Sequence, residues 1–101
     1  MINLDKVKTI CMESTANDQF TIGLSLHRSG RIEDAIYFYN KALEKNPCLP
    51  EALINLGAVY LEKNQFNKAE PLLKDALKIK PNDSKILSNL GNLFQNQKKF
   101  D

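Results

Sequence analysis

The stretch that decides the fold is Asn55–Pro81, NLGAVYLEKNQFNKAEPLLKDALKIKP, which sets a glycine, alanines and a closing proline among larger apolar residues. The same residue types recur at a spacing of 34 residues. Upstream, the matches to Gly57, Ala69, Ala76 and Pro81 are Gly23, Ala35, Ala42 and Pro47; downstream, Gly57 matches Gly91. A fixed period of this length indicates that the chain consists of copies of one structural unit.

Each copy reads as two helices joined by a short turn, because its apolar residues recur at the spacing of one helix face. The copies cover residues 16–49, 50–83 and 84–101, after an N-terminal segment of residues 1–15. We expect first helices over 17–29, 51–63 and 85–97, second helices over 33–45 and 67–79, and turns at SGRI, KNQF and QKKF. Pro47 and Pro81 should end the second helices, because the residue before a proline avoids helical geometry.

The glycines need a reason, since a glycine inside a helix costs about 1 kcal/mol relative to alanine. Gly23, Gly57 and Gly91 share one position of the unit, and an alanine follows 12 residues later in the first two copies. Small residues on facing helices allow a short distance between the helix axes. We therefore predict that the glycines serve the packing of the two helices within each unit.

Composition excludes several classes of protein. The 101 residues are 43% hydrophobic and 26% charged with a net charge of +2, which is typical of one folded soluble domain and predicts neither nucleic-acid nor membrane binding. Residues 1–15 lack the apolar run of a signal peptide or membrane span. Cys11 and Cys48 have no metal-type spacing, so we expect reduced thiols, a cytoplasmic protein, and no metal or cofactor.

The repeat pattern resembles the tetratricopeptide repeat, and the resemblance covers residues 16–101. It is carried by Leu53, Leu56, Gly57, Tyr60, Ala69, Leu73, Ala76 and Pro81, and in the first copy by Ile22, Gly23, Leu26, Ala35, Tyr39, Ala42 and Pro47. The resemblance implies an all-α fold, a right-handed solenoid of antiparallel helix pairs. Its members use the concave groove lined by the first helices, so the implied function is a non-catalytic protein–protein interaction module that binds an extended peptide or a partner helix.

The family pattern assigns the groove to equivalent positions of the three first helices. The candidate binding residues are Asn17, Phe20, Thr21, Leu24, His27, Ile54, Asn55, Ala58, Leu61, Lys85, Asn89, Asn92 and Asn96, and the same positions include Arg28, Glu51, Glu62, Ser88 and Gln95. Asn55 and Asn89 are the strongest candidates, because a carboxamide can satisfy both the donor and the acceptor of a peptide unit. Similar asparagine ladders hold peptide backbone in some members of the family.

Two sharper functions are disfavoured. Chaperone-binding members of the family clamp a C-terminal carboxylate with lysines, an arginine and asparagines, but only Asn55 and Lys85 agree with that set, and Phe20 and Leu24 stand at two of its other positions. Catalysis has no supporting motif, since the solitary His27 has no nucleophile on its helix face.

The chain's ends suggest an alternative function. The third copy stops after one helix that carries Leu87, Leu90 and Phe94, and no polar capping element follows. The chain then either is part of a longer repeat protein or enzyme, whose catalytic domain it would position, or self-associates through this edge as a scaffold. At the other end, we expect a short capping helix over Ile2–Met12, and Ser14 or Thr15 at the start of the first repeat helix.

Overall fold

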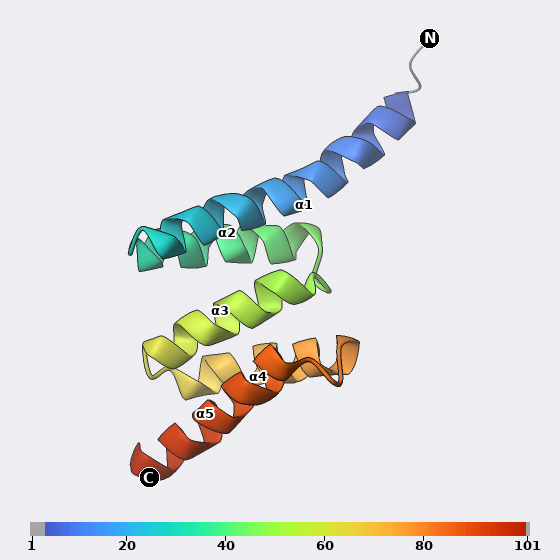
Figure 1. Ribbon diagram of the computed structural model, residues 1–101. Helices are drawn as coiled ribbons and strands as arrows, with labels where there is room; N and C mark the ends of the chain where they lie inside the picture. The colour runs from blue at the N-terminus through green and yellow to red at the C-terminus, as the bar shows by residue number, and fades with distance from the viewer. Residues whose placement is uncertain (1–3, 101) are drawn as a thin grey trace. The chain divides into compact units, whose positions relative to one another are not determined.

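The computed structural model describes the backbone of residues 4–100 and the side chains of residues 16–98. These residues form five helices and no strand: α1 (Leu4–Arg28), α2 (Ile32–Lys45), α3 (Pro50–Glu62), α4 (Phe66–Ile79) and α5 (Ser84–Phe100) (Figure 1). The chain divides into two compact units, Met1–Leu49 and Pro50–Asp101, at the boundary between the first and second copies. The prediction of an all-α helical repeat is confirmed.

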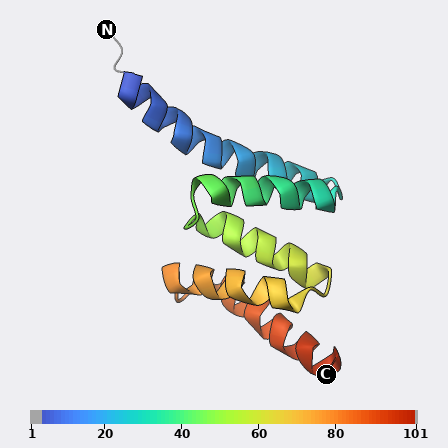
Figure 2. The same cartoon turned by 180° about the vertical axis from the view of Figure 1, so that it is seen from behind.

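Within each unit, consecutive helices pack against each other and run in opposite directions, as both views show (Figure 1, Figure 2). In unit 1, α1 packs on α2. In unit 2, α3 packs on α4, and α5 contacts both α4 and α3. Because α4 reverses the chain between them, α3 and α5 run in the same direction on one side of unit 2.

The predicted role of the glycines is confirmed in both complete helix pairs. A Cβ atom added to Gly23 would lie 2.7 Å from Cδ1 of Tyr39 and 3.4 Å from the carbonyl oxygen of Ala35. A Cβ atom added to Gly57 would lie 2.9 Å from Cγ of Leu73. Tyr39 and Leu73 are fully buried, so each glycine provides the space that a large side chain of the second helix fills.

Gly91 has no such partner among the described residues. Nothing lies within 4 Å of the position where its Cβ atom would be. On the same helix, the side chains of Leu87 and Phe94 are 49% and 48% exposed. The buried side of α5 consists of Ile86, Leu90 and Leu93. The α5 edge, defined here as Leu87, Gly91 and Phe94, is therefore an open surface of unit 2.

The buried Tyr39 also has a polar partner in unit 1. Its hydroxyl lies 3.2 Å from Nδ1 of His27, and its ring stacks in a tilted arrangement 5.8 Å from the ring of Phe20. A tyrosine hydroxyl taken out of water needs a hydrogen-bond partner, because an unpaired buried polar group is costly. His27 and Phe20 therefore contribute to the packing of unit 1.

The turns within the helix pairs depend on one backbone position. Gly30 (φ +83°) and Asn64 (φ +60°), which are equivalent residues of the first two copies, adopt the left-handed conformation. In this conformation the N–H of the following residue can donate a hydrogen bond back to the preceding helix. The backbone N–H of Arg31 donates to the carbonyl oxygen of Leu26 (2.9 Å), and the backbone N–H of Gln65 donates to the carbonyl oxygen of Tyr60 (2.8 Å).

The third copy has Lys98 at this position, and the predicted end of its first helix is wrong. The helix was expected to stop at residue 97 with a turn at QKKF, but α5 continues to Phe100. A lysine disfavours the left-handed conformation that glycine and asparagine tolerate, so the helical conformation persists.

The two proline stops are confirmed, whereas the predicted start of the first helix is wrong. The second helices α2 and α4 end two residues before Pro47 and Pro81, respectively. However, α1 begins at Leu4 and runs through Ser14 and Thr15 without a break, because neither glycine nor proline interrupts residues 4–22. The side chains of Ile2–Met12, on which the expected capping role depends, lie outside the described residues.

The three equivalent glycines give a test with an internal control. Gly91→Ala should raise the free energy of unfolding by about 0.5–1 kcal/mol, because it adds helix propensity in open space. Gly23→Ala and Gly57→Ala should lower it by about 1–3 kcal/mol, because Tyr39 and Leu73 must move. Urea denaturation of the three variants measures the difference. A gain in stability at Gly23 or Gly57 would contradict the packing argument.

Two tyrosines on α2 test the buried hydrogen bond. Tyr39→Phe should lower the free energy of unfolding by about 1 kcal/mol, because the bond to His27 is lost. Tyr37, which is 56% exposed on the same helix, provides the matched control, since Tyr37→Phe should change stability by less than about 0.5 kcal/mol. Equal losses from both substitutions would show that the His27 contact contributes nothing.

Candidate functional site

Two adjoining depressions lie along the surface between α3 and α5 in unit 2. The larger has a volume of about 600 Å³, and its lining residues are Ile54, Asn55, Ala58, Ser84, Lys85, Ser88 and Asn89. The smaller has a volume of about 290 Å³, and its lining residues are Ala58, Leu61, Glu62, Asn89, Asn92 and Asn96. Because Ala58 and Asn89 line both, we treat the two depressions as one surface, the α3–α5 furrow.

The furrow brings together every candidate residue that the family pattern places on α3 and α5. These residues are Ile54, Asn55, Ala58, Leu61, Lys85, Asn89, Asn92 and Asn96. Ser88 and Glu62, which occupy further groove positions, also line it. Ser84 was not anticipated by the sequence analysis; it is the first residue of α5, one position before those that the pattern assigns.

The candidate residues of α1 lie in unit 1. Asn17 and Thr21 are exposed on the same helix face, and the Thr21 hydroxyl donates to the carbonyl oxygen of Asn17 at 2.9 Å. Leu24 is half-buried, as are Phe20 and His27. The contacts of Phe20 and His27 with Tyr39 were missed by the sequence analysis. A large tyrosine opposite a glycine was the available signal, since such a side chain becomes buried and its hydroxyl then requires a partner.

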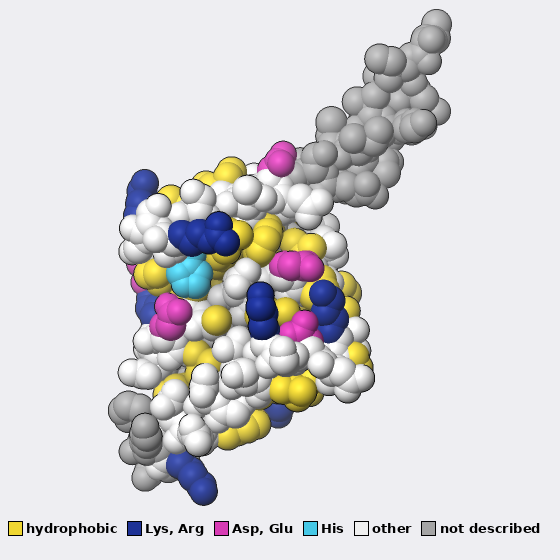
Figure 3. Space-filling model, in the orientation of Figure 1, with side chains coloured by type: hydrophobic (Ala, Val, Ile, Leu, Met, Phe, Trp, Pro, Cys, Tyr) yellow, Lys and Arg dark blue, Asp and Glu magenta, His cyan; other side chains and the backbone are white. Residues whose placement is uncertain are grey.

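Most of the residues that line the furrow are asparagines and serines, which are neutral and can form hydrogen bonds. The side chains of Asn55 and Asn89 are half-buried, and neither carboxamide makes a hydrogen bond with another described residue. Each carboxamide offers a carbonyl acceptor and an NH₂ donor. Over α5, the surface in Figure 3 is mostly white, the colour of neutral polar side chains and backbone, with patches of hydrophobic side chains, whereas Lys and acidic side chains gather elsewhere on the same face.

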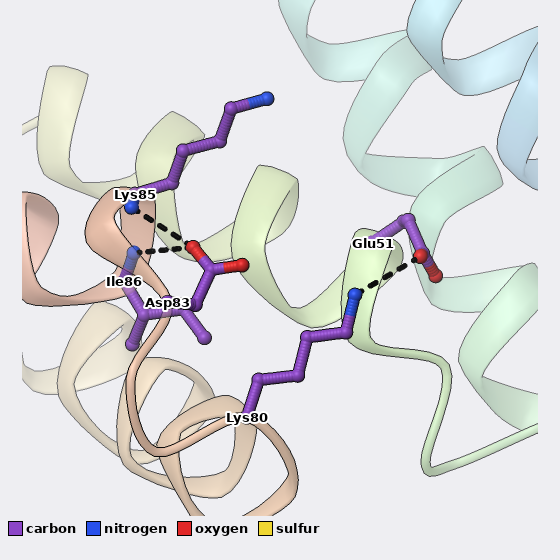
Figure 4. A network of polar contacts seen from close by, with 5 residues as sticks. All are labelled: Glu51, Lys80, Asp83, Lys85 and Ile86. Carbon is purple, nitrogen blue, oxygen red and sulfur yellow. Dashed lines mark hydrogen bonds and ion pairs between the residues drawn. The ribbon is translucent and has the colours of Figure 1, made fainter.

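Polar contacts fix the N-terminal end of the furrow (Figure 4). Oδ1 of Asp83 accepts hydrogen bonds from the backbone N–H groups of Lys85 (2.9 Å) and Ile86 (3.3 Å), which caps α5. The Lys85 side chain extends away from this carboxylate. Nearby, Nζ of Lys80 lies 3.7 Å from Oε1 of Glu51 and links the end of α4 to the start of α3. Both partners are about half exposed, so this ion pair adds little stability.

The described part of the chain contains neither a metal-type cluster of side chains nor a membrane-spanning helix. Among these residues, no group of three His, Cys, Asp or Glu side chains could hold a metal ion. Within the same residues, no helix combines the length and the apolar character needed to cross a lipid bilayer. The furrow offers hydrogen bonds, apolar surface at Ile54, Ala58 and Leu61, and one charged side chain toward each end.

Comparison with known proteins agrees with the repeat pattern. The sequence model of the tetratricopeptide repeat family matches residues 26–93. The chain is 34% identical over 65 residues to protein O-mannosyl-transferase tmtc2 of Xenopus laevis, which covers 61% of this chain and 8% of that protein. It is 33% identical over 72 residues to BBSome complex member BBS4 of Bos taurus, with 71% of this chain and 14% of that protein covered.

A human relative, tetratricopeptide repeat protein 6, is 34% identical over 77 residues, which cover 73% of this chain and 15% of that protein. The chain thus spans less than a sixth of the length of each of these three relatives. The match across most of the chain, together with the glycine-centred helix pairs, settles the family. Tetratricopeptide repeats generally mediate protein–protein interactions, their fold is typically non-catalytic, and this chain belongs to the tetratricopeptide repeat family.

Proposed function

We propose that the chain is a non-catalytic interaction module that binds an extended peptide on the surface lined by its first helices. The observation that carries the proposal is the pair of carboxamides of Asn55 and Asn89. They face one furrow, and neither is engaged by another described residue. The backbone of an extended peptide presents one N–H and one C=O per residue, and each carboxamide can satisfy both.

The furrow favours an extended peptide over a partner helix. A helix satisfies its backbone groups internally, so it would leave the carboxamides without a peptide partner. A helix also binds through a continuous apolar stripe. The furrow instead has apolar lining residues on α3 alone, Ile54, Ala58 and Leu61, whereas every lining residue of α5 is polar or charged. An extended chain can place alternate side chains over the apolar residues and keep its backbone on the amides.

The candidate residues of α1, Asn17, Phe20, Thr21, Leu24 and His27, enter the proposal through the family pattern alone. We further propose a cytoplasmic location and partners that are proteins rather than nucleic acids or membranes. The net charge of +2 is small. The exposed Cys48 is a free thiol, which suits a reducing compartment.

Selection from a library of random peptides, some with free C-termini, tests the proposal. Enriched peptides should bind the wild type in calorimetry, and Asn55→Ala/Asn89→Ala should weaken that binding by at least ~1 kcal/mol, because one hydrogen bond or more is lost. Asn67→Ala is the matched control, since Asn67 is exposed on α4 and lines neither depression of the furrow. Failure to enrich any peptide, or affinity indifferent to both furrow asparagines, would reject the proposal.

A second candidate function is self-association, and the α5 edge favours it. Leu87 and Phe94 are each about half exposed on either side of the open Gly91. In the complete pairs, the equivalent glycine receives a large side chain from a neighbouring helix. A helix from a second copy of the chain could fill the same space at Gly91. In a longer protein, the α5 edge could instead contact another domain of the same chain. Such a contact would fix the position of a catalytic domain, for example a transferase domain, relative to the repeats.

Sedimentation velocity over a range of protein concentrations tests self-association. The wild type should show a dimer at high concentration, and Leu87→Asp/Phe94→Asp should weaken it at least tenfold, because charged groups replace the apolar contact. Tyr37→Asp, at an exposed aromatic residue of unit 1, provides the control and should leave the association unchanged. A monomeric wild type, or a dimer insensitive to the double substitution, would exclude this edge as the contact.

A further inference from the structure

The furrow is elongated along the helices, which limits how a ligand can lie in it. The larger depression is lined by residues 54–58 and 84–89, and the smaller by residues 58–62 and 89–96. The two therefore follow each other from the N-terminal toward the C-terminal ends of α3 and α5. From Lys85 to Asn96 the helix rises by about 16 Å. An extended peptide of about five residues has the same length.

The two depressions carry opposite charges. Lys85 is the one charged residue that lines the larger depression, and Glu62 is the one that lines the smaller. The lining residues between them are neutral. The ammonium group of Lys85 makes no ion pair with a described residue. Its acidic neighbours in Figure 4 have other partners, because Asp83 caps α5 and Glu51 pairs with Lys80.

Both charges are also placed at the unfavourable ends of their helices. Lys85 is the second residue of α5, where the helix terminus carries partial positive charge. Glu62 is the last residue of α3, where the terminus carries partial negative charge. Placements that oppose the helix dipole are not explained by helix stability. Glu62 also has a contact within the protein, so its charge is shared between that contact and a ligand. Such placements are found at functional sites, where a side chain serves a ligand at a cost to local stability.

We propose, on the basis of the proposed function, that the furrow selects extended peptides of about five residues that are dipolar, with an acidic side chain at one end and a basic side chain at the other. An acidic side chain of the peptide lies at Lys85, and a basic side chain lies at Glu62. At each end, the ligand's charge is opposite both to the nearby side chain and to the partial charge of the nearby helix terminus. A peptide in the opposite order places like charges together at both ends, so charge sets the direction in which the peptide binds.

A double charge reversal in the full chain tests this inference. Random linear peptides are selected on the wild type and on Lys85→Glu/Glu62→Lys, which has the same net charge. Peptides enriched on the wild type should carry an acidic and a basic residue about four positions apart, in one order. Peptides enriched on the reversed variant should carry the same pair in the opposite order.

Fluorescence anisotropy on labelled peptides then gives the size of the effect. The best wild-type peptide should bind the reversed variant at least about fivefold more weakly, and its charge-exchanged version should bind the reversed variant at least about fivefold more tightly than it binds the wild type. Asp75→Lys/Lys78→Glu on α4 is the matched control. It also preserves net charge, lines neither depression, and should leave both affinities unchanged.

The outcomes separate this inference from the function on which it rests. Peptides that are enriched and depend on Asn55 and Asn89, but carry no ordered pair of charges, would overturn the dipolar selection and leave the peptide-binding function intact. Enrichment whose charge order is the same on both proteins would do the same. Absence of any enrichment would overturn both.

Discussion

The structure depends on one close approach, between a glycine on the first helix of a pair and a large side chain on the second. Gly23 receives Tyr39, and Gly57 receives Leu73. The lack of a Cβ atom lets the buried side chain reach the backbone of the facing helix, which sets the distance between the helices. This contact compensates for the low helix propensity of glycine. A larger residue at Gly23 or Gly57 would displace the buried side chain and weaken the packing of that helix pair.

The turns between the helices then determine how consecutive helices are arranged. A left-handed residue after the first helix, Gly30 or Asn64, reverses the chain within three residues. In unit 2, this reversal and the one that follows α4 bring α3 and α5 to the same side. The furrow is the direct result, because residues one period apart, such as Asn55 and Asn89, come to lie beside each other.

The sequence predicted most of the fold because the repeat supplies several concordant signals at one period. Helix pairing, the two proline stops and the glycine contacts all follow from it. The errors concern single positions where the pattern lapses. Lys98 replaces a turn residue, so α5 runs on to Phe100, and Ser14 and Thr15 lie inside a helix although their types favour its start. A capping signal is weak when the preceding residues can also be helical.

The candidate site was predicted less completely. Helix periodicity and the family pattern gave the residues that share a face, and eight of them line the furrow. Neither indicated that Tyr39 would take His27 as a hydrogen-bond partner, because that contact depends on how two helices approach in space. Likewise, the sequence did not show that Lys85 and Glu62 lie toward opposite ends of one furrow, which is the arrangement that would orient a charged peptide.

The joint between α4 and α5 has a consequence for the length of such proteins. Because α5 occupies the same position in its copy as α3 does in the preceding one, the Asp83–Ser84 peptide bond joins one copy to the next. A further copy of residues 50–83 inserted at this junction would place another glycine-centred pair in the same register. Each insertion would add one more first helix beside α5, and with it one more asparagine at the position of Asn55. The footprint on a long, repetitive ligand would then grow in steps, and avidity would rise without any change in the individual contacts.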